Sequence, residues 1–367
     1  MNYQVFTSES VAAGHPDKIC DQISDAILDE AIKAYPKSRV AVETLVTKDH
    51  CVLAGEVTCP KTLDFAQIAR NVIKDLGYTR EDFGFWYKSL IEVYIHQQSP
   101  DIAMGVDDGG AGDQGMMFGY ACEETPELMP LPIMLAHTLM IVKDEAMSSS
   151  LNYLKPDGKS EVRVTYEKGV PKAVTGVVLA TPHEDQISSA QLEEDLFQKV
   201  VVPSLNKYGF AIKKKDLVIN GTGRWIWGGP ATDTGVTGRK IIVDSYGGMA
   251  RIGGGCFSGK DPTKVDRSGA YGARFIAKNI VAAGLASRVE VQVAYIIGKK
   301  EPLTNEIETF GTNKVSLAKI RKFADNLLDL SPLSIINNLK LRQPIYLKAA
   351  AYGHFGREGF PWEKIIK

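Results

Sequence analysis

Residues 39–58 read RVAVETLVTKDHCVLAGEVT, and this stretch decides the fold. Two runs rich in β-branched residues, 39–47 and 51–58, flank three polar residues, and this length and composition favour a β-hairpin. A helix is expected next at 62–76, followed by a strand at 90–97. The sequence therefore predicts a β-β-α-β unit near the start of the chain.

The same order of elements returns further along the chain. We expect strands at 161–167 and 172–180, then a helix at 189–202 and a strand at 216–220. A third, less regular pass comprises a strand at 240–244, a helix at 266–285, a strand at 288–298 and a C-terminal helix at 316–330. The repeat lies in element order and not in sequence, and it predicts an α+β fold of three related domains that contain β-β-α-β.

Composition limits the function classes. At 367 residues the chain is longer than one hydrophobic core usually serves, so two or three domains are expected. Lys and Arg number 43 against 44 Asp and Glu, which gives a formal net charge of -1. Because no global field favours nucleic acid or an anionic membrane, we expect neither as a partner, and any anion site must be local.

The cysteines and the N-terminus indicate the compartment. The five cysteines are scattered and form no C-x-x-C pair, which argues against a disulfide framework and a Cys-built zinc site. The first residues lack the basic and apolar regions of a signal peptide, and no apolar run approaches the ~18 residues that span a bilayer. We therefore expect a cytoplasmic protein.

A glycine- and lysine-rich segment, GGCFSGKD at 254–261, almost fits the P-loop pattern. Asp261 stands where that loop needs Ser or Thr to hold Mg²⁺, so the segment is not a P-loop. Its glycines still let backbone N–H groups approach a phosphate, and Lys260 and Lys264 add two cations. A flexible surface turn with solvated lysines is the alternative interpretation.

A second glycine-rich segment, GAGDQG at 110–115, satisfies the dinucleotide fingerprint G-x-G-x-x-G. That fingerprint requires a strand immediately before it, whereas the expected strand ends at residue 97 and a loop intervenes. A hinge or a loop that covers the substrate is therefore favoured over a Rossmann site.

A helix expected at 16–34 begins with Pro16 and carries apolar residues at helical spacing. His15 and Asp17 lie at its N-terminus, where they could simply cap the helix. A helix N-terminus also binds phosphate, so His15 could donate to a phosphate oxygen while Asp17 holds a hard metal ion. Asp266, at the head of another expected helix, has the same two interpretations.

Further cations and aromatics admit two interpretations each. Arg239 and Lys240 could belong to a solvated strand end, or could form a polyphosphate cradle with Lys260 and Lys264. In GRWIWGG at 223–229, the two tryptophans could be core residues on alternate faces of a strand, or one could stack on adenine.

Four segments, read together, resemble the S-adenosylmethionine synthetase (methionine adenosyltransferase) family, bacterial type. They are GHPDK at 14–18, GAGDQG at 110–115, GGGCFSGKDPTKVDRS at 253–268 and AAYGHFGRE at 350–358. The resemblance covers essentially the whole chain. It implies three α+β domains in a pseudo-threefold arrangement, with domains at 1–101, 115–233 and 234–367 and a flexible active-site loop at 102–114. It also implies a homodimer with active sites between subunits, and a dimer of such dimers.

The resemblance also implies site residues and cofactors, carried over position by position. ATP would contact His15, Asp113, Asp157, Gly158, Lys159, Arg224, Trp225, Asp233, Arg239, Lys240, Cys256 and Lys260. Methionine would contact Glu56, Gln98, Asp233 and Lys264. Asp17 and Asp266 would bind Mg²⁺, with two ions per site, and Glu43 would bind K⁺. The catalytic residues would be His15, Lys159, Arg239, Lys240 and Lys260.

The implied reaction is attack by the methionine sulfur on C5′ of ATP, followed by hydrolysis of the departing tripolyphosphate. A thioether carries no proton to remove, so no Ser-His or Cys-His base is required. Three features depart from the family pattern: the segment at 103–110 is shorter than in many bacterial members, Trp225 stands where Phe is common, and Cys256 stands where Ala is common. The thiol so placed near the nucleotide could be sensitive to oxidation.

Two other function classes fit part of this inventory. A small-metabolite kinase would use the same glycine-lysine loop and carboxylates, and would release ADP. A nucleotide-binding regulatory module would bind ATP without consuming it.

Overall fold

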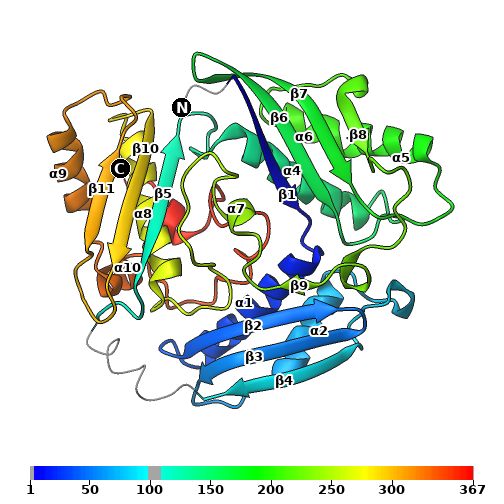
Figure 1. Cartoon of the computed structure of the whole chain (residues 1–367), viewed down its shortest axis with the longest axis horizontal. Coiled ribbons are helices and arrows are strands. Elements are labelled where there is room, and N and C mark those ends of the chain that lie inside the picture. The colour runs from blue at the N-terminus through cyan, green and yellow to red at the C-terminus, as the bar shows by residue number, and fades with distance from the viewer. Residues whose placement is uncertain (1–3, 98–108, 367) are drawn as a thin grey trace.

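The computed structural model describes residues 4–97 and 109–366. Its strands form three sheets around a common centre (Figure 1), with the orders β4-β3-β2-β9, β1-β6-β7-β8 and β11-β10-β5. The strands are β1 (Val5–Val11), β2 (Arg39–Thr47), β3 (His50–Thr58), β4 (Leu90–His96), β5 (Gly115–Cys122), β6 (Lys159–Glu167), β7 (Val170–Ala180), β8 (Leu217–Ile219), β9 (Gly235–Val236), β10 (Arg288–Tyr295) and β11 (Thr304–Glu308).

Helices fall into two sets by their place in the fold. Three central helices precede the hairpins, namely α1 (Pro16–Ala34), α4 (Leu131–Met147) and α8 (Val265–Ala282). The others are α2 (Phe65–Asp75), α5 (Ser189–Leu196), α6 (Val202–Asn206), α7 (Ile241–Asp244), α9 (Leu317–Leu327) and α10 (Pro332–Asn338), with a π-helical turn at Phe197–Val201 and 3₁₀ turns at Glu81–Phe83, Lys214–Asp216, Gly229–Ala231 and Pro361–Glu363.

The chain repeats one unit three times. Each unit runs from a central helix through an antiparallel hairpin to a second helix: α1-β2-β3-α2, α4-β6-β7-α5 and α8-β10-β11-α9. In the first two units a further strand, β4 or β8, adds parallel to the hairpin. The expected α+β fold of three related units is confirmed, although the third unit has no such final strand among the described residues.

The three units exchange strands in a cycle. The strand that precedes each central helix pairs antiparallel with the hairpin of the next unit: β1 with β6, β5 with β10, and β9 with β2. Each of the expected divisions at 1–101, 115–233 and 234–367 contains one central helix and its hairpin. The strands β1, β5 and β9 each pair with a hairpin that lies in another division. A sequence repeat could not reveal this exchange, because the pairing is between distant segments.

The central helices form the interior of the molecule. Sixteen of the 19 residues of α1 and 16 of the 18 residues of α8 are buried. Close packing explains part of this burial: a Cβ on Gly119 of β5 would lie 2.0 Å from the carbonyl carbon of Ala273 in α8, so only glycine lets strand and helix approach. No helix among the described residues is long and apolar enough to cross a membrane.

Three local predictions were wrong or incomplete. The run 240–244 is not a strand, because residues 241–244 form the short helix α7 with Lys240 as its N-cap. The strand that precedes it, β9, ends at Val236. The GRWIWGG segment at 223–229 forms no strand either. The helix α4 was not predicted because it is apolar on almost every side, with 12 of 17 residues buried, and so lacks a polar face.

Candidate active site

Two of the three central helices begin with the same arrangement. Asp17 is the second residue of α1 and Asp266 is the second residue of α8, whereas Pro132 takes this place in α4. Lys240 Nζ lies 2.5 Å from a carboxylate oxygen of Asp17, and Lys260 Nζ lies 2.9 Å from one of Asp266. The repeat of the fold therefore places an acid–lysine pair at two related helix N-termini.

His15 is the N-cap of α1, as one of the two interpretations predicted. Its Nδ1 accepts a hydrogen bond from the backbone N–H of Asp17 at 3.2 Å, so the proton of a neutral ring is on Nε2. Burial, followed by the charge of Lys240, lowers the pKa of His15 to about 3, which keeps the ring neutral at physiological pH. Nε2 is buried and has no hydrogen-bond partner within the described ranges. The ring therefore holds a free N–H donor at the helix N-terminus.

Three cations lie around this donor. Lys240 contacts Asp17, and Arg239 Nε lies 3.8 Å from the other carboxylate oxygen of Asp17. The charge of Lys159, the first residue of β6, also lowers the pKa of His15. Burial disfavours the ionised form of Asp17, but Lys240 and the N–H of Val236 outweigh it and lower its pKa. Positive charge and a helix N-terminus together favour an anion.

The glycine-rich loop at 253–261 forms the second group. Gly255 lies directly against Asp266, since a Cβ there would be 2.1 Å from the carboxyl carbon. Burial opposes the charge of Lys260, but Cys256, Asp266 and Glu43 prevail and raise its pKa. Burial raises the pKa of the Cys256 thiol to about 11, so it is protonated at neutral pH and a poor target for oxidation.

The two groups meet at one glycine. Gly238 has φ +81°, and a Cβ there would lie 2.7 Å from Cys256 Sγ. The backbone that carries Arg239 and Lys240 thus packs directly on the loop that carries Lys260. These cations, distant from His15 in sequence, therefore lie in one region of the structure.

A row of aspartates on α1 holds both loops. Asp17, Asp21, Asp25 and Asp29 are spaced by four residues and lie on one face of the helix. Asp17 accepts from the N–H of Val236 at 2.9 Å, Asp21 from Gly238 at 2.8 Å, Asp25 from Gly259 at 2.9 Å, and Asp29 from Tyr346 and Leu347 at 3.0 Å each. Sequence reasoning singled out only Asp17, although the four-residue spacing of the row was visible.

Asp157 links two segments that the sequence assigned to the nucleotide. Its carboxylate is buried and accepts from the N–H of Gly158 at 2.7 Å and from the N–H of Gly229 at 2.8 Å. Burial raises its pKa, although these amides oppose the shift. Trp225 lies four residues before Gly229 in sequence and is half-buried. Its Nε1 donates to the carbonyl of Trp227 at 2.5 Å.

Other predicted residues lie at the surface. Arg224 contacts Asp185, and Asp113 accepts from the N–H of Gln114 at 2.7 Å. Asp233 is exposed. Within the described residues, no hydrogen bond or ion pair joins Arg224 or Asp113 to the groups around His15 and Lys260. The GAGDQG segment leads into the strand β5 and not into a helix, which excludes the dinucleotide fingerprint.

Two of the predicted methionine residues, Glu56 and Lys264, lie on different elements, the strand β3 and the N-terminus of α8. Glu56 of β3 lies 3.3 Å from His96 of β4, on the first sheet. Lys264 caps α8 and forms an ion pair with buried Asp261, whose pKa stays low because this pair outweighs burial. Gln98 and most of the 102–114 loop, including the shortened segment from residue 103, lie outside the described residues, as residues 98–108 do.

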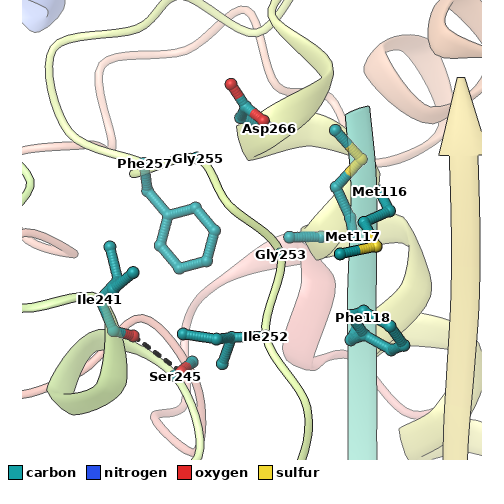
Figure 2. A pocket seen from close by; sticks show the side chains of 11 residues that line it. Met116, Met117, Phe118, Ile241, Ser245, Ile252, Gly253, Gly255, Phe257 and Asp266 are labelled. Atoms are coloured by element: carbon teal, nitrogen blue, oxygen red, sulfur yellow. Dashed lines mark hydrogen bonds between the residues drawn. The ribbon is translucent and has the colours of Figure 1, made fainter. Parts of the chain in front are cut away.

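A small pocket of about 20 Å³ lies between β5, α7 and the glycine-rich loop. Figure 2 shows Ile241, Ile252 and Phe257 facing one another across it, with the Asp266 carboxylate at one end and Met116 beside it. Its walls are mainly apolar. It is too small for a nucleotide, and its lining lacks the cations that a triphosphate needs.

Among the described residues, Asp17 and Asp266 are the candidate metal ligands of this site. In the part of the chain that the structure describes, no group of three or more His, Cys, Asp or Glu residues could hold a metal ion. Mg²⁺ commonly takes one or two carboxylates and completes its octahedron with water and substrate phosphates. Asp17 and Asp266, each a single carboxylate at a cationic helix N-terminus, fit that mode.

Comparisons with known proteins cover the whole chain. Residues 3–100, 108–225 and 227–364 match the models described as the N-terminal, central and C-terminal domains of S-adenosylmethionine synthetase. The chain is 50% identical over 385 residues to an S-adenosylmethionine synthase from Desulforudis audaxviator, covering 100% of the chain and 97% of the relative. A relative of that name from Sulfurovum sp. is 50% identical over 374 residues, and one from Treponema denticola 49% over 378, each with 100% and 97% coverage.

Proposed function

The chain belongs to the S-adenosylmethionine synthetase family and makes S-adenosylmethionine from ATP and methionine, and we propose that the cationic N-terminus of α1 binds the polyphosphate of ATP during this reaction. The observation that carries the proposal is the neutral His15 ring, with a free buried Nε2–H beside Lys240, Lys159 and Arg239. All four are hydrogen-bond donors, as a polyphosphate requires, and Lys240 and Arg239 are held beside Asp17.

The chemistry follows from this placement. The methionine sulfur attacks C5′ of ATP, and the bond from C5′ to the triphosphate oxygen breaks. His15, Lys159, Arg239, Lys240 and Lys260 would stabilise the negative charge that develops on the leaving oxygen, a task that fixed donors perform without reorganisation. The same residues would then hold tripolyphosphate while water cleaves it to pyrophosphate and phosphate.

We assign the carboxylates to cations. Asp17 and Asp266 would each hold one Mg²⁺, with phosphate oxygens as further ligands, and these ions would supply charge neutralisation. Lys240 and Lys260, which pair with the two carboxylates in the chain alone, would then be free to turn to phosphate. We assign K⁺ to Glu43, whose charge acts on Lys260.

The remaining site residues stay proposals. For the nucleotide they are Asp113, Asp157, Gly158, Arg224, Trp225, Asp233 and Cys256, and for methionine they are Glu56, Gln98, Asp233 and Lys264. Asp157 supports its assignment through the backbone, because its carboxylate already holds two N–H groups in place. We place Trp225 against the adenine as a stacking surface.

We propose that the site is completed by a second copy of the chain. Glu43 and Glu56 lie opposite Ala54 and Ala41 on one face of the first sheet, while Val40 and Val42 point to the core on the other. Figure 1 shows α2 behind this sheet. By the register of β3 and β4, Leu90 and Tyr94 lie on the same face as Glu56, and they are 54% and 61% exposed.

A second copy would cover this apolar and acidic face, and the resulting dimer would place the site between subunits. We further propose that dimers pair into a tetramer. The five cysteines are free, which suits the cytoplasm in which we place the enzyme.

Product analysis tests the function. Incubation with ATP, methionine, Mg²⁺ and K⁺, resolved by chromatography and mass spectrometry, should give a sulfonium product with one pyrophosphate and one phosphate per ATP. ADP in step with methionine consumption would instead identify a kinase. Tripolyphosphate accumulating free in solution would leave the transfer step standing and exclude only the coupled hydrolysis.

A further inference from the structure

Lys143, which is buried, and Asp144, which is largely buried, are adjacent residues near the C-terminal end of α4 and belong to none of the family motifs. Lys143 is fully buried, and its ammonium donates to the carbonyls of Lys155 at 2.7 Å, Pro156 at 3.2 Å and Asp157 at 3.0 Å. It also lies 3.0 Å from Asp144 Oδ1. One side chain thus fixes three consecutive carbonyls of the segment that leads to Lys159.

Asp144 fixes two other segments. Its Oδ2 accepts from the backbone N–H of Ala13 at 3.0 Å and from the hydroxyl of Tyr352 at 2.6 Å. Ala13 is two residues before His15, and Tyr352 belongs to the AAYGHFGRE segment. The adjacent pair therefore ties together three motif-bearing segments that are far apart in sequence.

The two segments so held also contact each other directly. A Cβ on Gly14 would lie 2.5 Å from the Cβ of Pro156, so the chain at Gly14 rests on the proline without room for a side chain. The N–H of Ala12 donates to the carbonyl of Gly158 at 2.9 Å. His15 and Lys159 therefore each follow directly after a backbone segment that Lys143 or Asp144 holds, and the two segments contact each other.

The structure assigns to Lys143 and Asp144 a positioning role: they fix the distance between His15 and Lys159 and so the fit of the site to the polyphosphate of ATP. This assignment rests on the proposed roles of His15 and Lys159. Neither Lys143 nor Asp144 touches substrate in it. The ammonium of Lys143 suits the task because its charge-assisted hydrogen bonds can be shared among several carbonyls.

The test compares two buried lysines. Lys143→Met removes the ammonium with similar side-chain length, while Lys278→Met removes another buried lysine on a central helix, whose ammonium pairs at 2.6 Å with Glu363. Both variants should lose thermal stability. Only Lys143→Met should also raise the KM for ATP and lower kcat, together by roughly 10- to 100-fold in kcat/KM, with the KM for methionine nearly unchanged.

Two further variants keep the test decisive if Lys143→Met fails to fold. Lys143→Arg can still donate to the carbonyls and should restore most of the KM for ATP. Tyr352→Phe removes one hydrogen bond to Asp144 without a cavity and should show the same ATP-specific change, smaller in size. A KM for ATP that stays at the wild-type value in all folded variants overturns the positioning role. A wild-type enzyme that forms no sulfonium product would instead refute the proposed function.

Discussion

Replacing His15 separates its structural role from its proposed chemical role. His15→Asn keeps a side-chain acceptor for the N–H of Asp17, because Asn is a good N-cap, but loses the Nε2–H that has no partner in the chain. His15→Ala loses both. The cap contributes about 1 kcal/mol of stability, so His15→Ala should unfold at a lower temperature, whereas His15→Asn should stay close to the wild type.

Activity should respond differently from stability. A hydrogen bond to a charged phosphate contributes about 1.5–3 kcal/mol, so both variants should lose roughly 10- to 150-fold in kcat/KM for ATP. Because burial and Lys240 hold the pKa of His15 near 3, the loss should be constant between about pH 6 and 9. Steady-state kinetics at several pH values, with melting temperatures alongside, measure both effects. Wild-type activity in His15→Asn, or a loss that appears only below pH 6.5, would refute the reasoning.

Three further predictions concern charge and assembly. Lys260→Ala should weaken turnover and Lys264→Ala should mainly raise the KM for methionine, each by roughly 30- to 1,000-fold in kcat/KM; near-normal kinetics in both folded variants would contradict the cradle. Mixing inactive Asp17→Asn and Glu56→Ala chains, altered at the α1 N-terminus and on the face that a second copy would cover, should restore part of the activity, and verified heterodimers without recovery would argue against shared sites. Burial lowers the pKa of His137 to about 3, so its contribution to stability is present above pH 6.5 and is lost as the pH falls. Relative to His137→Gln, the free energy of unfolding of the wild type should fall by up to about 1.4 kcal/mol per pH unit in denaturant titrations. A pH-independent difference would contradict burial of the neutral ring.

Elements with clear local signals were predicted well. The helix at 16–34 was placed to the residue because Pro16 begins it and isoleucines repeat at helical spacing. The hairpin at 39–58 likewise matched β2 and β3 to within one residue. Elements defined by their neighbours were missed, namely α4, which lacks a polar face, and the exchanged strands such as β5, whose partner β10 lies far along the chain.

The candidate site shows the same division. Residue types and motifs indicated the acids, the cations and the helix end that we propose binds phosphate. They could not show that Lys240 contacts Asp17 and Lys260 contacts Asp266, because the first pair is separated by 223 residues. They also could not show that the Asp157 carboxylate is occupied by backbone N–H groups and is thus a link between segments.

The aspartate row on α1 connects this fold to its chemistry. Like charges four residues apart on a helix destabilise it by about 0.2–0.5 kcal/mol per pair, so the row cannot serve the helix itself. Asp21 and Asp25 are completely buried, and Lys18 and Arg267 neutralise them with contacts of 2.8 and 2.6 Å. Such buried charges seldom add net stability, because desolvation offsets their attraction.

What the row supplies is geometry. Asp17, Asp21 and Asp25 each take one backbone N–H from the segments that carry Arg239, Lys240 and the glycine-rich loop. Carboxylate bonds to N–H groups are strong and directional, and their acceptors sit on one rigid helix. The cations of both loops are therefore fixed in the same frame as His15 at the helix start, which is the arrangement that stabilisation of a departing polyphosphate requires.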